Sequence, residues 1–158
     1  MCILYHAGAH PRQGAIYDDL VRGLAARAGV ERLMLVSVII PALNEAENIR
    51  ACIAAVRRDY APDEVEIVVA DGGSTDGTLD MIPAGVAHIP TERGRAVQMN
   101  RGAAAAHGDI LLFCHADSLL PAGWRAAVID ALGDPGVSGG VFRTQILPET
   151  TWLLWLRN

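Results

Sequence analysis

From Val36 onward the sequence alternates short apolar runs with segments of helical periodicity, and this alternation constrains the fold more than any other feature. The apolar runs lie at residues 36–40, 65–69 and 110–114. Such short, nearly continuous apolar runs predict strands that are buried on both faces. Buried strands that alternate with helices predict a mostly parallel sheet with helices on both faces, which is the α/β class.

Local signals place the helices and two weaker strands. Apolar residues at positions 49, 52, 53 and 56 share one face of a helix. Asn44 is the expected N-cap of that helix, with Glu47 completing a capping box. Pro41 is expected to end the strand before it. Two more helices are predicted at residues 95–107 and 121–132, and two weaker strands at residues 86–89 and 137–142.

The chain divides into three parts by its patterning. Residues 34–142 carry the alternation of strands and helices and form the expected domain. Residues 1–33 are a leader of unknown role, with a short strand expected at residues 3–5 and an amphipathic helix at residues 17–28. Residues 143–158 are interpreted as a truncated C-terminal segment.

Composition excludes several classes of protein. The chain has 158 residues, 51% of them hydrophobic, which is enough to bury the core of one domain. Its net charge of −5 argues against binding to nucleic acid, which needs a basic surface.

Three widely spaced cysteines, with no signal-peptide pattern, indicate a reduced, cytoplasmic protein. No run reaches the roughly 18 apolar residues that a membrane helix needs. The apolar residues 152–156 leave open packing on the core, continuation into a longer element, or peripheral contact with a membrane; the first two are favoured.

Three polar clusters each follow a buried strand directly. They are residues 41–45, 71–78 and 115–117. In a parallel sheet these positions lie along one carboxyl edge, where open α/β folds bind ligands. The glycines of the second cluster would let a ligand approach the backbone closely.

The second cluster and the start of the next helix suit a nucleotide diphosphate. For Ser74 and Asp76, capping of a helix after a tight turn is as good an explanation as ligand binding. Asp71 is not needed as a cap and can accept the N–H of a nucleobase. The next helix has a positive N-terminal end, and Arg95 or Arg93 adds a full charge for a diphosphate. Considered alone, these arginines are better explained as solvated residues of an exposed turn.

His115 and Asp117 are spaced i, i+2 after a strand, which predicts that their side chains point the same way. Asp117 is a hard oxygen ligand for Mg²⁺ or Mn²⁺, which would bridge phosphate oxygens. The less favoured alternative for Asp117 is an N-cap. A hydrogen-bonded histidine at the edge of the core is an equal alternative for His115, because imidazole suits Mg²⁺ less well than a carboxylate does.

Four motifs in this order resemble family 2 glycosyltransferases, enzymes of the GT-A fold, which is a Rossmann-like α/β architecture. The resemblance covers residues 35–142. The motifs are Pro41-Ala42-Leu43-Asn44-Glu45 for the family's P-x-x-N-E, residues 71–78 for its D-D-G-S-x-D-G-T, Gly94, Asn100 and Gly102 for its G-x5-N-x-G, and Asp117 for the second Asp of its D-x-D. The amino-acid sequences of residues 94–100 and 115–117 resemble those of a bacterial subgroup of small soluble family members.

The resemblance implies transfer of a sugar, with inversion, from a nucleotide diphosphate-sugar to an unknown acceptor, and a UDP-sugar is the favoured donor. Asp71 would contact the base, Arg95 would hold the diphosphate and Asp117 would bind Mg²⁺ or Mn²⁺. The implied donor-binding residues are Pro41, Asn44, Glu45, Asp71, Gly72, Ser74, Arg95, Asn100 and His115.

The sequence also departs from the family. Gly72 stands where the family has a second Asp, Met99 where an Arg is common, and His115 where D-x-D has its first Asp. After Phe142 the only acid is Glu149, so the carboxylate that serves the family as general base is not found.

The catalytic residue is therefore unknown. The alternative function is a nucleotide-sugar-binding fragment without transfer activity. A chain that lacks the acceptor-side part would leave an apolar face uncovered, which favours a homo-oligomer.

Overall fold

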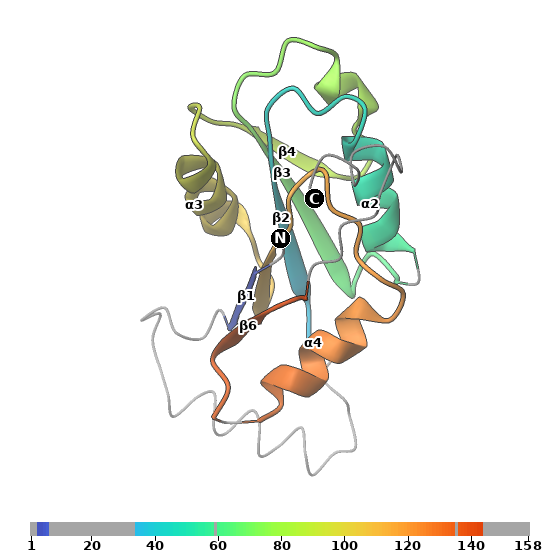
Figure 1. Ribbon diagram of the computed structural model, residues 1–158, viewed down its shortest axis with the longest axis vertical. Coiled ribbons are helices and arrows are strands. Elements are labelled where there is room, and N and C mark those ends of the chain that lie inside the picture. The colour runs from blue at the N-terminus through green and yellow to red at the C-terminus, as the bar shows by residue number, and fades with distance from the viewer. Residues whose placement is uncertain (1–2, 7–33, 59, 135, 144–158) are drawn as a thin grey trace, which may run out of the picture.

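The computed structural model describes residues 3–6, 34–58, 60–134 and 136–143, and the first of these segments by its backbone alone. They form a six-stranded sheet with the strand order β4-β3-β2-β5-β1-β6 (Figure 1). The strands are β1 (Ile3–His6), β2 (Val36–Ala42), β3 (Val65–Asp71), β4 (Ala87–Pro90), β5 (Ile110–Phe113) and β6 (Gly139–Val141). β4, β3, β2 and β5 run parallel, and β1 is antiparallel to both of its neighbours. The predicted α/β fold with a mostly parallel sheet is confirmed.

Helices cover both faces of this sheet, as predicted. α2 (Ile49–Arg57) and α4 (Trp124–Leu132) lie on one side of the central strands, and α3 (Arg95–Ala105) lies on the other (Figure 1). A short 3₁₀ helix, η2 (Thr78–Met81), follows β3. None of the described helices is both long enough and apolar enough to cross a membrane.

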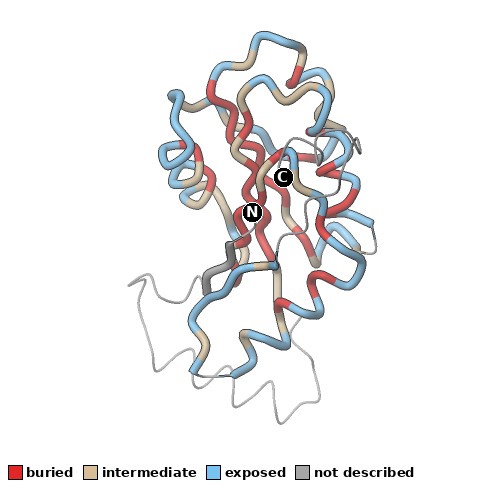
Figure 2. Tube along the Cα trace, in the orientation of Figure 1, coloured by how far each residue is buried: buried red, intermediate tan, exposed pale blue. Residues whose placement is uncertain are grey.

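The core follows from the alternation of side chains along β2. Val36, Val38, Ile40 and Ala42 point to one face and join the buried cluster with α2 and α4. Ile39 points to the other face, where a Cβ added at Gly102 of α3 would overlap its Cγ2. Buried residues accordingly run along the central strands in Figure 2.

Strand β2 continues through Pro41 to Ala42, so the prediction that Pro41 ends it is wrong. Pro41 has no N–H to donate, and none is needed at this point. The carbonyl of Ile39 faces β5 and accepts the N–H of Cys114 at 2.9 Å. Pro41 lies two residues later and faces the same side, beyond the residues of β5 that pair with β2.

The capping box predicted for α2 is not formed. The N-cap is Asn48, whose side chain makes no bond to the helix end. Asn44 precedes it with a φ of 56°, and its Oδ1 accepts the N–H of Thr75 instead. The carbonyl of Glu45 shapes the entry to α2 by accepting the N–H groups of Asn48 and Ile49.

Other boundaries shift by a few residues. Helix α3 ends at Ala105 rather than at His107, because the backbone N–H of His107 donates to Glu66 Oε2 at 2.8 Å. The third helix begins at Trp124, after the turn that follows Pro121. The weaker strands predicted at residues 3–5, 86–89 and 137–142 are observed as β1, β4 and β6.

Part of the predicted leader belongs to the sheet, because β1 pairs with both β5 and β6. The helix predicted at residues 17–28 lies outside the described residues. The boundary at residue 34 stays a prediction.

Candidate functional site

The three polar clusters follow three neighbouring strands of the sheet, which are β3, β2 and β5. Ala42 pairs with Asp71, so β2 and β3 end at the same level. Phe113 pairs with Ile39, so β5 ends three residues earlier along β2, at the same edge of the sheet. The clusters therefore lie along one edge, as their positions after buried strands predicted.

The first two clusters are held together by hydrogen bonds between their loops. Asn44 exchanges two: its N–H donates to Ser74 Oγ and its Oδ1 accepts the N–H of Thr75, each at 2.9 Å. The backbone N–H groups of the next two residues also donate to the second loop, that of Glu45 to Thr78 Oγ1 at 2.8 Å and that of Ala46 to Asp76 Oδ2 at 3.0 Å. These hydrogen bonds join the two loops, and the side chains of Asn44 and Ser74, both predicted to bind the nucleotide-sugar, are part of this framework.

Asp71 ends β3 and is only 5% exposed. Its carboxylate accepts the N–H of Gly73 at 2.9 Å, the N–H of Ser74 at 3.1 Å and the hydroxyl of Ser74. The interpretation that Asp71 is not needed as a cap is therefore wrong, because Asp71 closes this turn. Its contact with a base stays a prediction, and such a contact would have to share the carboxylate with the turn.

Asp76 stabilises the start of η2. Its Oδ1 accepts the N–H of Thr78 at 2.9 Å as well as the hydroxyl of Thr78. The pKa of Asp76 is lowered, chiefly by the hydroxyl of Thr78 and next by the N–H of Ala46. The cap explanation of Asp76 is thus the one that the geometry supports.

The N-terminal end of α3 carries no acidic residue in its first turn and no side-chain cap on Gly94, which has a φ of 132°. Its first N–H groups and the exposed Arg93 and Arg95 are positive groups near the carboxyl edge. Among the described residues neither arginine forms an ion pair, whereas Arg101 lies 3.7 Å from Glu92.

The third cluster forms a turn, in which the N–H of Ser118 donates to the carbonyl of His115 at 3.0 Å. The pKa of His115 is lowered, mainly by burial and further by the positive charge of Arg95, while Asp117 and Glu45 act in the opposite direction. Glu45, Arg95 and Asp117 come from three different segments, and each influences the pKa of His115. The lowered pKa favours the uncharged imidazole.

Asp117 is exposed, and its described partner is the hydroxyl of Ser118 at 3.3 Å. In the part of the chain that the structure describes, no three His, Cys, Asp or Glu side chains are grouped to hold a metal ion. One exposed carboxylate is enough for an ion that takes its other ligands from phosphate oxygens and water. The residues therefore fit a metal shared with a bound diphosphate rather than an all-protein metal site.

The other predicted residues are placed as follows. Pro41 is half-buried in β2, Gly72 is buried directly after β3, and Asn100 is exposed beyond the first turn of α3. The side chain of Asn100 makes no hydrogen bond to a described residue.

Gln98 is a site residue that the sequence interpretation missed. It is 5% exposed, and its Nε2 donates to the carbonyl oxygens of Ala42 and Ala70. Its position four residues before Gly102 puts it on the face of α3 that packs against the sheet. A polar residue on that face was the signal that would have identified it.

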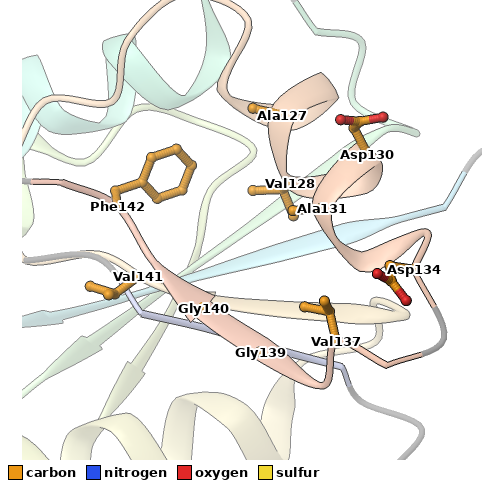
Figure 3. A pocket seen from close by; sticks show the side chains of 10 residues that line it. All are labelled: Ala127, Val128, Asp130, Ala131, Asp134, Val137, Gly139, Gly140, Val141 and Phe142. Carbon is orange, nitrogen blue, oxygen red and sulfur yellow. The ribbon is translucent and has the colours of Figure 1, made fainter.

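A groove of about 480 Å³ lies elsewhere, between α4 and β6 (Figure 3). Val128 and Ala131 line one side, Val141 lines the other, and Asp130 and Asp134 lie at one end. None of the predicted donor-binding or metal-binding residues lines it.

Comparison with curated proteins finds glycosyltransferases. The chain is 37% identical over 125 residues to the PGL/p-HBAD biosynthesis glycosyltransferase of Mycobacterium tuberculosis, covering 73% of this chain and 48% of that protein. It is 38% identical over 93 residues to the glycosyltransferase YfnE of Bacillus subtilis, covering 54% of this chain and 24% of that protein. The chain thus spans less than half the length of these relatives.

Solved structures give the same result. The mannosyltransferase PcManGT of Pyrobaculum calidifontis, in complex with GDP-Man and Mn²⁺, is 30% identical with a TM-score of 0.55, over 75% of this chain and 41% of that one. The glucosyl-3-phosphoglycerate synthase of Mycobacterium tuberculosis, with Mn²⁺ and UDP-glucose, is 28% identical with a TM-score of 0.56, over 79% and 46%. Residues 37–157 also match the sequence profile of Glycosyl transferase family 2. The chain belongs to Glycosyl transferase family 2.

Proposed function

We propose that the chain binds a nucleotide diphosphate-sugar at the carboxyl edge of β3, β2 and β5, and that the protein transfers the sugar to an acceptor with inversion. The observation that carries the proposal is the convergence of three loops and the N-terminal end of α3 on this edge. Two solved structures to which this chain is similar are complexes, one with GDP-Man and the other with UDP-glucose.

Different residues bind different parts of the nucleotide-sugar, according to their chemistry. The Asp71 turn takes the base, with a UDP-sugar as the favoured donor. Arg95 and the free N–H groups of α3 take the diphosphate, since both supply positive charge and hydrogen-bond donors. Asp117 takes Mg²⁺ or Mn²⁺, and Mn²⁺ is present in two of the similar structures. When bound, such an ion neutralises the charge that develops on the leaving diphosphate.

The imidazole of His115 also has a role in this arrangement. Its pKa is lowered, mainly by burial and further by the positive charge of Arg95, which favours the uncharged form. We infer that the imidazole forms a hydrogen bond with the bound nucleotide-sugar and leaves the carboxylate of Asp117 available to the metal.

A nucleotide-sugar-binding fragment without transfer activity is the second candidate. It is favoured because Glu149 is the only acid after Phe142, so the carboxylate that serves the family as general base is not identified in the sequence. Release of UDP from UDP-glucose separates the two: transfer, even to water, releases UDP, whereas a binding fragment leaves the donor intact.

A thermal-shift titration with UDP, GDP and uridine, each with and without Mn²⁺, tests donor binding. We expect a diphosphate to raise the melting temperature more with Mn²⁺ than without it, and uridine to have little effect. At a ligand concentration of about 100 times Kd, binding adds about 2.7 kcal/mol to the free energy of unfolding, which is readily measured. No shift with any nucleotide would count against the proposal.

A further inference from the structure

Gln98 joins the N-terminal turn of α3 to the ends of two strands. Its Nε2 donates to the carbonyl of Ala42 at 2.6 Å and to the carbonyl of Ala70 at 3.0 Å. Ala42 is the last residue of β2 and Ala70 the last but one of β3, directly before Asp71. One buried amide therefore sets the distance between the Asp71 turn and the helix that carries Arg95.

Gly72 lies against the same amide. A Cβ at position 72 would come 3.0 Å from Gln98 Nε2 and 3.3 Å from Gln98 Cδ, closer than most real Cβ contacts. Both hydrogens of Nε2 are used in hydrogen bonds, so the amide cannot retreat without stretching them. Gly72 is not among the residues with positive φ, so it is needed for space and not for backbone conformation.

We propose that Gln98 is a positioning residue of the donor site, and that glycine at position 72 leaves the room that its amide occupies. The pair fixes the Asp71 turn relative to Arg95, and with them the separation of the base and diphosphate sites. This proposal rests on the proposed function for its binding readout, while the interlock of the two residues is tested separately.

A double-mutant cycle of Gly72→Ala and Gln98→Ala tests the interlock through the melting temperature. In the wild-type background we expect Gly72→Ala to lower the melting temperature, because the new methyl group pushes against a fixed amide. In the Gln98→Ala background the same change should leave it unchanged or raise it, because alanine restricts the unfolded chain. Equal effects of Gly72→Ala in both backgrounds would overturn the interlock.

Gln98→Met separates positioning from packing, because methionine has a similar length and no donor. The probe is UDP or GDP with Mn²⁺, whichever stabilises the wild type more. We expect the Met variant to melt cooperatively and to bind the nucleotide about tenfold more weakly, which corresponds to about 1.4 kcal/mol. A cooperative Met variant with wild-type affinity would overturn the positioning role.

The two readouts also separate this proposal from the proposed function. If the wild type binds no nucleotide, the proposed function fails, and the melting temperatures of the cycle still decide the interlock. If the wild type binds nucleotide but a cooperatively melting Gln98→Met variant binds it with the same affinity, the positioning proposal fails alone.

Discussion

Asn44 shows at the scale of one residue why these motifs keep their polar residues. It adopts a left-handed conformation with φ 56°, which asparagine tolerates better than most residues. Its side chain and backbone both bond to the neighbouring loop. The residue is therefore explained by loop geometry before any ligand is considered.

Replacing Asn44 separates its conformation from its hydrogen bond. Asn44→Ala loses the bond to Thr75 and keeps an unfavourable φ, so we expect a loss of about 2 kcal/mol in the free energy of unfolding. Asn44→Gly loses the bond alone, and we expect about 1 kcal/mol. Urea unfolding of both variants measures the difference, and a glycine variant no more stable than the alanine variant would contradict the explanation.

At the scale of elements, the far end of α3 is fixed by a network around Glu66. Its carboxylate accepts the hydroxyl of Ser37 and the backbone N–H of His107, and the ring of His107 lies 2.8 Å from Oε1. Gly108 follows, where a Cβ would come 2.7 Å from Leu35 O. Gln98 and Glu66 therefore attach the two ends of α3 to the same pair of strands.

Glu66 predicts a pH dependence of stability. Burial alone would raise the pKa of Glu66, but the hydrogen bonds from His107 and Ser37 outweigh it and lower the pKa. A lowered folded-state pKa gives stability that is present above the unfolded value, about 4.3, and is lost as the pH falls through the folded one. Between pH 6 and pH 3, we expect the free energy of unfolding, measured with urea, to fall less steeply with decreasing pH for Glu66→Gln than for the wild type. Glu47→Gln makes the same charge change at an exposed position and should keep the wild-type slope; a wild-type slope for Glu66→Gln would contradict this role.

The contact between α3 and β2 gives a further prediction at this scale. Alanine favours helices by about 1 kcal/mol over glycine, yet Gly102→Ala should destabilise the protein, because its methyl group would overlap Ile39 and overpacking costs about 1–3 kcal/mol. Urea unfolding measures the sign. Ala104→Gly, at an exposed position of the same helix, measures the effect of helix propensity alone on the free energy of unfolding. A stabilised Gly102→Ala variant would show that the helix moves away from the sheet at little cost.

Elements and edges were predictable from sequence because they depend on patterns that short segments carry. Continuous apolar runs identified β2, β3 and β5, and the parallel order then placed three clusters at one edge. The partners of polar side chains were not predictable, since Asn44 bonds to Thr75 across 31 positions and Gln98 to Ala42 across 56. Asp71 is a different case, because its partners Gly73 and Ser74 lie only two and three residues away, so this turn was open to prediction from local sequence.

At the scale of the whole molecule, the site joins segments that are distant in sequence around a single sheet edge. Two loops form a preformed framework, α3 contributes positive charge, and the turn after β5 contributes an imidazole and a carboxylate. The chain spans less than half the length of the curated relatives described above.

This arrangement predicts that Arg95 and Asp117 contribute to nucleotide affinity in different ways. Arg95→Ala removes a charge that acts on the diphosphate directly, so it should weaken UDP or GDP binding with and without Mn²⁺, by about tenfold or 1.4 kcal/mol. Asp117→Asn removes the proposed metal ligand, so it should abolish the gain in affinity from Mn²⁺ and leave metal-free binding close to that of the wild type. Isothermal titration with and without Mn²⁺ measures both, and Asp130→Asn, exposed on α4, is the control for loss of one negative charge. An Asp117→Asn variant that keeps the full Mn²⁺ effect would remove Asp117 from the metal site, because no other described carboxylate belongs to its turn.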